Sequence, residues 1–171
     1  MESDPFKSDR LVYRAVEESD DDFIYSLQRD TFARANSGIA VLKPAGKKRS
    51  KDTIGYLTEK TLLAVIICIP NSTTDSEEPD IGIQIEKQHQ SLGYGTEAIH
   101  WVTHWGFMMA GMHRIAIGTA SYNIGAAKLY ERIGFVPEGR RREAIWFNGK
   151  FHDMLDFSIL RHEWDARKDS P

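Results

Sequence analysis

The chain has 171 residues, with 22 Lys and Arg against 25 Asp and Glu, which gives a net charge of −3 with histidine neutral. Hydrophobic residues make up 41% and charged residues 27%, a balance typical of globular proteins and unlike that of disordered chains. The chain lacks the basic excess of nucleic-acid binders, and its longest apolar run, residues 62–69, is shorter than the ~20 residues that span a bilayer. We therefore expect one domain over residues 1–171, with no nucleic-acid or membrane partner.

The cysteine content and the first residues predict the compartment. Cys68 is the only cysteine, so no internal disulfide can form, which favours a reducing compartment. The N-terminus is polar and acidic, unlike a secretory signal. We expect a cytoplasmic protein, with the nucleus as an alternative because residues 43–51 carry five basic side chains. We interpret this basic run and the acidic run 71–80 as loops.

Strands dominate the predicted first half of the chain. The segment 11–16 reads as a strand. A helix capped by Ser19 or an adjacent Asp follows to about Arg29, with acidic residues at its positive end. Three more strands are predicted at residues 53–58, 62–69 and 81–85, the last with isoleucine at every second position.

Helices and strands alternate in the second half. A helix is predicted over 94–110, ending near Gly111, with an apolar stripe made of Ala98, Trp101, Val102, Trp105 and Met109. A strand at 115–119 precedes a helix that Asn123 caps and Gly134 ends. Asn148-Gly149 predicts a two-residue hairpin turn. This order indicates an α/β fold with a mixed sheet and helices on both faces.

The most informative segment joins the predicted strand 81–85 to the helix that starts at Tyr94. Gly93 and Gly95 lie at this junction, where glycine allows backbone amides to converge on an anion and the helix N-terminus adds partial positive charge. The pattern predicts a cradle for a diphosphate, although a plain tight turn before a helix is the alternative. No acidic residue follows near position 115, as a dinucleotide fingerprint requires. Thr96-Glu97 also stands where a P-loop needs Lys-Ser/Thr.

Two motifs resemble those of the GNAT superfamily of N-acetyltransferases. Gln90-x-x-Gly93-x-Gly95 is similar to its acetyl-coenzyme A motif, and residues 123–135 are similar to its second signature, in the same order and at a fitting separation. The segments 8–14, 146–153 and 160–164 resemble the RimJ/RimL-like branch, which acetylates the terminal alanine of ribosomal proteins.

The resemblance implies a fold and a coenzyme site. It implies the GNAT fold, with about seven strands and a splay between parallel strands at 81–86 and 115–119 that holds pantetheine. The pyrophosphate would lie on the amides of residues 90–96. The cofactor-binding residues implied are Ile83, Ile85, Gln90, Ser91, Leu92, Gly93, Tyr94, Gly95, Thr96, Asn123, Ala126 and Tyr130.

The resemblance also implies direct transfer of acetyl from the thioester of acetyl-CoA to a primary amine. Tyr130 matches the family's general acid, although its place on an apolar helix stripe also fits a core residue. The backbone amide of Ile85 is our candidate oxyanion donor. Asp80 is the candidate base, with Glu78, Glu86 and His152 as alternatives.

The acceptor is left open by the sequence. No sharp acid–base arrangement is visible, and an α-amine of pKa near 8 needs less help than a lysine near 10.4. We therefore expect a protein or peptide α-amino group, with a small-molecule amine or a non-catalytic acyl-CoA-binding role as alternatives. An acidic rim from residues 20–22 and 77–78 would favour polyamines as the acceptor.

No metal is expected, because Trp101 stands where a zinc motif built on His100 and His104 needs Glu. Both monomer and homodimer stay open.

Overall fold

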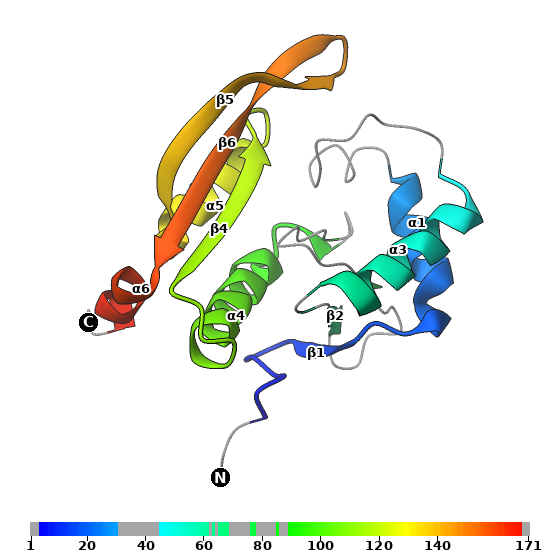
Figure 1. Ribbon diagram of the computed structural model, residues 1–171, viewed down its shortest axis with the longest axis horizontal. Coiled ribbons are helices and arrows are strands. Elements are labelled where there is room, and N and C mark those ends of the chain that lie inside the picture. Colours follow the sequence, from blue (N-terminus) through cyan, green and yellow to red (C-terminus); the bar gives the residue numbers. More distant parts are fainter. Residues whose placement is uncertain are drawn as a thin grey trace. The chain divides into compact units, whose positions relative to one another are not determined.

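The computed structural model describes residues 4–30, 45–61, 63, 65–68, 76–77, 85 and 89–168. The chain divides into two compact units, residues 1–37 with 42–99 and residues 38–41 with 100–171. Figure 1 shows their helices and strands. The single domain expected over 1–171 stays a prediction. The predicted strand 81–85, apart from its last residue, lies outside the described residues.

The first unit contains a small antiparallel sheet and two helices. β1 (Val12–Ala15) pairs with β2 (Val65–Cys68), which pairs with β3 (Ser76–Glu77). A 3-10 turn, η1 (Glu18–Asp20), leads into α1 (Asp21–Arg29), which lies beside α3 (Lys47–Lys60) in Figure 1. A buried apolar cluster joins these elements and consists of Val16, Ile24, Ile54, Leu57 and Ile66.

The helix α3 corrects two predictions. Residues 53–58 are helical and not a strand, and the basic run expected as a loop over 43–51 is helical from Lys47 onward. The buried side chains Ser50, Ile54 and Leu57 recur at helical spacing, so packing of that face overrides the strand preference of a threonine- and isoleucine-containing segment.

The expected start of the first helix is confirmed, with Asp20 and not Ser19 at the N-cap position of α1. Asp20 also takes part in the turn η1 that precedes the helix, where Glu17 and Asp20 form a reciprocal capping box. Asp20 is drawn into the interior by Arg14, which donates two hydrogen bonds of 2.9 and 2.7 Å to its carboxylate. The helix α1 therefore begins at Asp21, as a cap at Asp20 predicts, and the additional turn η1 precedes it.

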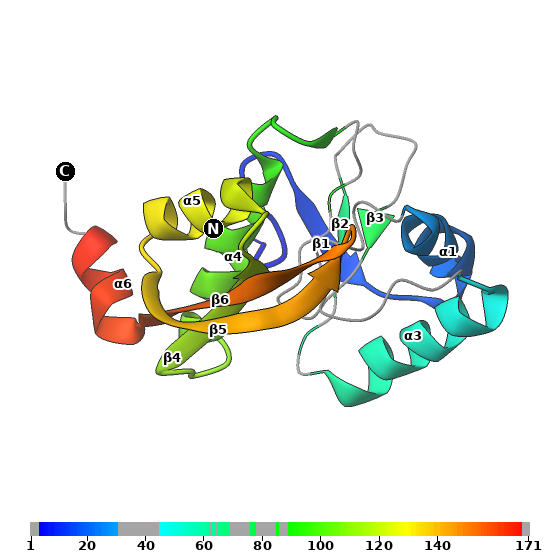
Figure 2. The ribbon, with the colours of Figure 1, turned by 90° about the horizontal axis from the view of Figure 1, so that it is seen from above.

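The second unit is a three-stranded antiparallel sheet with helices. β6 (Lys150–Leu160) lies between β4 (Arg114–Ala120) and β5 (Val136–Phe147). β5 and β6 form a long, curved hairpin, and α5 (Ile124–Ile133) and α6 (Arg161–Lys168) follow β4 and β6 (Figures 1 and 2). Asn148 and Gly149 both have positive φ, at 49° and 78°, which is the geometry of a type I′ turn and confirms the predicted hairpin.

The helix α4 (Tyr94–Met108) begins in the first unit and continues in the second. Ala98 and Trp101 of the predicted stripe are buried, but Met109 lies beyond the helix and its side chain is 61% exposed. Thr103 and Phe107 are buried in its place. No helix within the described ranges is long and apolar enough to cross a membrane.

Candidate functional site

The glycine turn, residues 90–96, runs directly into the N-terminus of α4. Ser91 and Gly93 adopt positive φ values of 61° and 87°, and the carbonyl oxygen of Gly93 accepts the first helical hydrogen bond, from the amide of Glu97 at 3.2 Å. Amides in the first turn of a helix have no intrahelical acceptor and point back along the helix axis. Residues 90–93 are exposed, so this end of α4 has the geometry of an anion site.

Gln90 holds the start of the turn. Its side-chain Nε2 donates a 2.8 Å hydrogen bond to the carbonyl oxygen of Ile85, while its own side chain remains exposed. Gln90 therefore connects the glycine turn to the last residue of the predicted strand 81–85. The sequence predicts Gln90 as part of the coenzyme motif but does not predict this hydrogen bond to the backbone.

Arg10 holds the other side of the turn and was missed by the sequence analysis. Its NH1 group donates to the carbonyl oxygen of Leu92 at 3.0 Å, its Nε donates to Oε2 of Glu97 at 2.7 Å, and its guanidinium lies 4.8 Å from the centroid of the Tyr94 ring. Arg10 precedes Leu92 by 82 residues, so only the folded chain brings the two together.

Glu97 lies in the first turn of α4, where its carboxylate forms an ion pair with Arg10. Oε1 accepts hydrogen bonds from the Ser8 hydroxyl at 2.6 Å and from the Arg10 amide at 2.7 Å. Burial alone would raise the pKa of this carboxyl, but the bonds from Ser8 and Arg10 and the Arg10 charge outweigh it and hold the pKa below its ordinary value. Glu97 is therefore charged at neutral pH and paired with a cation.

The start of α5 confirms the predicted cap. Asn123 Oδ1 accepts a 3.3 Å hydrogen bond from the amide of Ala126, and Gly134 ends the helix in the left-handed region at φ 117°. Asn123 and Ala126 are half-buried. A role for either residue toward a coenzyme stays a prediction.

Tyr130 lies on the inner side of α5, in the second unit. Its ring meets Phe157 edge-on at 5.7 Å and Phe135 at 6.1 Å between centroids. Within the described part of the chain its hydroxyl makes no hydrogen bond. Burial raises the pKa of this phenol to about 12, so it is protonated at neutral pH and has a proton to donate.

The predicted site residues fall into three groups. Ile85 and residues 90–96 belong to the first unit, and Asn123, Ala126 and Tyr130 to the second. Asp80, Ile83, Glu78 and Glu86 lie outside the described residues.

His152 is the remaining candidate base. Its ring packs edge-on against Tyr122 at 4.7 Å between centroids, and its Nε2 is buried with no hydrogen-bond partner among the described residues. A role for His152 as the base stays a prediction.

The two histidines on α4 do not form part of a metal cluster in the described ranges. No group of three His, Cys, Asp or Glu side chains with metal-binding spacing occurs there. His100 instead lies 5.4 Å from Trp164 between ring centroids, and burial lowers its pKa.

Comparisons with known proteins define the class to which this chain belongs. The profile of the acetyltransferase (GNAT) domain family matches residues 10–136, which include the glycine turn, α4 and α5. The chain is therefore a member of the GNAT acetyltransferase family, whose cosubstrate is acetyl-CoA. The predicted family and fold class are confirmed. The number of strands stays a prediction, because the described residues form two three-stranded sheets with antiparallel pairs.

Two relatives that are similar in sequence are named for different acceptors. YdaF of Bacillus subtilis, provisionally named a ribosomal N-acetyltransferase, is 31% identical over 106 residues, which are 62% of this chain and 58% of YdaF. The spermidine N(1)-acetyltransferase of Vibrio cholerae is 31% identical over 87 residues, or 51% of this chain and 50% of the relative. The chain thus spans about half the length of the curated relatives it matches.

Two solved structures share the fold. The V. cholerae spermidine N-acetyltransferase in complex with CoA and spermine has a TM-score of 0.71 and 20% identity, with 92% of this chain and 99% of that chain covered. RimL, a ribosomal L7/L12 alpha-N-protein acetyltransferase in complex with coenzyme A, also has a TM-score of 0.71, at 16% identity, with 90% and 95% covered. At these identities the likeness concerns the fold alone.

Proposed function

We propose that the protein is an acetyl-CoA-dependent N-acetyltransferase that acts on the α-amino group of a protein or peptide. The observation that carries the acetyl-CoA part is the glycine turn at the N-terminus of α4, inside the region that matches the GNAT family. Backbone amides of residues 90–96 would hold the pyrophosphate, because a diphosphate is favoured where amides converge on a helix N-terminus.

In the proposed reaction the neutral amine attacks the thioester carbonyl. The new C–N bond gives a tetrahedral intermediate with an oxyanion and a positively charged nitrogen, and that nitrogen loses a proton to water. The C–S bond then breaks, and CoA leaves as a thiolate that water protonates. The Ile85 amide is the proposed oxyanion donor and Tyr130 the proposed donor to sulfur. Because the pKa of Tyr130 is about 12 and a thiol is near 8.5, full proton transfer is uphill by roughly three thousandfold. We therefore assign Tyr130 a hydrogen bond to the thiolate, which takes its proton from water as the product departs, so that the phenol stays protonated.

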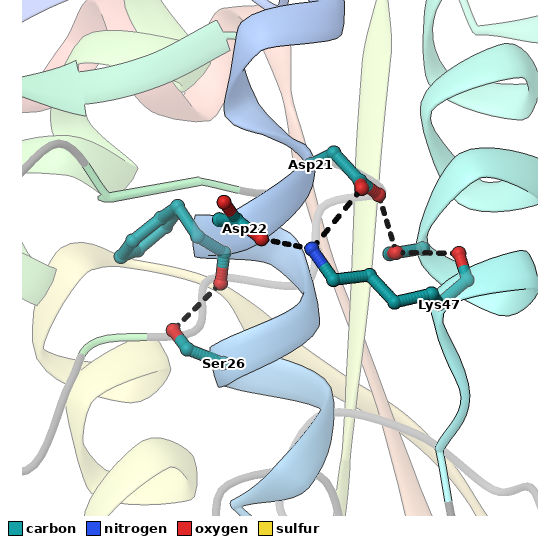
Figure 3. A network of polar contacts seen from close by, with 6 residues as sticks. Asp21, Asp22, Ser26 and Lys47 are labelled. Atoms are coloured by element: carbon teal, nitrogen blue, oxygen red, sulfur yellow. Dashed lines mark hydrogen bonds and ion pairs between the residues drawn. The ribbon is translucent and has the colours of Figure 1, made fainter.

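The acidic run 20–22, which joins η1 to α1, bears on the choice of acceptor. A polyamine needs free carboxylates, yet Arg14 occupies Asp20 through two hydrogen bonds, and Lys47 lies between Asp21 and Asp22 (Figure 3). The Ser50 hydroxyl also donates to Asp21, and this bond holds the pKa of Asp21 below its ordinary value. Each of these three carboxylates is already paired, which supports a monoamine acceptor over a polycation. The side chains of residues 77–78, the other part of the expected acidic rim, lie outside the described residues.

The ionisation of the acceptor supports the same choice. At pH 7 roughly one α-amine in ten is neutral, whereas well under 0.1% of lysine-type amines are. Of the candidate bases, the described residues include His152, whose ring packs edge-on against Tyr122 and whose Nε2 makes no hydrogen bond among these residues. An α-amine needs the least from a base, so it suits this chain best.

A polyamine acceptor is the second candidate, because a spermidine N(1)-acetyltransferase is among the relatives. A thiol-release assay with acetyl-CoA distinguishes the two when it compares Ala- and Ser-initiated peptides with spermidine, spermine and free amino acids. We expect kcat/KM for a peptide to exceed that for spermidine by at least about tenfold. A preference for spermidine would reject the α-amine assignment. CoA binding without turnover of any amine would instead indicate a non-catalytic acyl-CoA-binding protein.

A further inference from the structure

Arg10 and Glu97 form a charge pair beside the glycine turn, a place where an anion would feel both charges. The side chain of Arg10 is 49% exposed and that of Glu97 is 12% exposed. A carboxylate at a helix N-terminus occupies the same favourable potential that a bound diphosphate would use. Left uncompensated, Glu97 would therefore repel the ligand that the turn is proposed to hold.

The contacts around Glu97 divide into two kinds. The Ser8 hydroxyl and the Arg10 backbone amide satisfy Oε1 without supplying a net charge. Only the Arg10 guanidinium, through Nε at 2.7 Å from Oε2, supplies a positive charge. Among the ion pairs of the described residues, Arg10 is the only cation paired with Glu97. Truncation of the Arg10 side chain would therefore leave Glu97 hydrogen-bonded but unneutralised.

The same guanidinium also fixes the turn itself. NH1 donates to the Leu92 carbonyl oxygen at 3.0 Å, which turns that carbonyl toward Arg10. NH2 lies 3.2 Å from the place that a Cβ on residue 93 would take. The arginine thus approaches the backbone closely because position 93 is glycine.

We propose that Arg10 is a positioning residue for the coenzyme diphosphate, which neutralises Glu97 and holds the Leu92 carbonyl away from the anion. This inference rests on the proposed function, since it assumes that the glycine turn binds the diphosphate of CoA. Arg10 is not a catalytic residue here, because its contacts are with the turn and with α4.

A double-mutant cycle on CoA binding tests the inference. We expect Arg10→Ala to raise the Kd for CoA about tenfold and Glu97→Gln to leave it within about twofold, because the amide oxygen of the substitution still accepts from Ser8 and from the Arg10 amide. The double variant should recover most of the affinity, with a Kd within about threefold of wild type. In steady-state assays Arg10→Ala should raise KM for acetyl-CoA and leave kcat within about twofold.

Controls keep the result interpretable. Arg14→Ala removes another arginine of the first unit, one that pairs with Asp20, and should leave the Kd unchanged; thermal melting of each variant verifies folding. If Arg10→Ala does not fold, Arg10→Met replaces it in the cycle. An unchanged Kd in Arg10→Ala, or no recovery in the double variant, overturns the inference while the proposed function stands. Failure of the wild-type protein to bind CoA rejects the proposed function itself.

Discussion

The side-chain amide of Gln90 donates a 2.8 Å hydrogen bond to the backbone carbonyl oxygen of Ile85, and so joins the two ends of the segment that leads into the glycine turn. The side chain of Gln90, a residue of the predicted coenzyme motif, therefore binds the protein's own backbone. This bond fixes where the turn begins relative to Ile85, whose backbone amide is the proposed oxyanion donor.

Replacement of that glutamine should weaken coenzyme binding. Gln90→Met keeps the length of the side chain but removes the donor, and one exposed hydrogen bond contributes about 0.5–1.5 kcal/mol. We expect the Kd for CoA to rise about two- to tenfold, with kcat at saturation nearly unchanged. Calorimetric titration measures this, and Lys128→Met on the exposed face of α5 serves as the control. Equal affinity of Gln90→Met and wild type would show that the bond does not order the site.

Gly93→Ala should lower both stability and affinity. Position 93 has a φ of 87°, which costs a residue with a Cβ about 1–2 kcal/mol, and the new Cβ would stand 3.2 Å from Arg10 NH2. Gly55→Ala is the matched control, because nothing lies within 4 Å of its Cβ position. In the middle of α3 this change should stabilise the protein by about 0.5–1 kcal/mol. Urea unfolding checks both variants, and an unaltered midpoint for Gly93→Ala would contradict the geometry of the turn.

Tyr130→Phe should reduce turnover and leave folding intact. The variant loses the proposed donor to the leaving thiolate, which corresponds to about a 10- to 10³-fold fall in kcat. The melting temperature should hardly change, since the hydroxyl makes no hydrogen bond within the described residues and the ring contacts with Phe135 and Phe157 persist. Tyr122→Phe provides the comparison. A kcat like that of wild type would remove Tyr130 from the mechanism.

The pH profile of kcat/KM follows from the same phenol. Because burial raises the pKa of Tyr130 to about 12, the donor form is complete below pH 10 and is lost only as the pH rises through about 12. The amine must be neutral, so the rate should rise with pH up to about 8 for an α-amine and then level off. Initial rates between pH 6 and 10 test this. An alkaline decline near pH 9 that disappears in Tyr130→Phe would contradict it.

Local signals in the sequence predicted the elements that local chemistry determines. Asn123 and Gly134 bound α5 as expected, since a cap and a left-handed glycine act within one turn of helix. Asn148-Gly149 gave the hairpin for the same reason. The helix α3 was missed because Thr53 and Ile54 favour a strand locally, whereas burial of Ile54 and Leu57 against α1 decides the outcome.

The candidate site was only half visible in the sequence. Gln90 and Gly93 could be found because their spacing is a motif, but the contact of Arg10 with Glu97 joins residues 87 apart. No sequence pattern near Arg10 or Glu97 predicts this contact, and only the fold brings the two residues together. Likewise the acidic run 20–22 looked free to bind a polycation, although Arg14 and Lys47 already pair with its carboxylates.

Amide hydrogen exchange with and without CoA tests the central claim most directly, because it reports on the backbone groups proposed to hold the diphosphate. We predict that CoA slows exchange at the amides of residues 91–96, and that this protection is weakened in Gly93→Ala. Tight binding of CoA with unchanged exchange over residues 91–96 would place the diphosphate elsewhere and contradict the account.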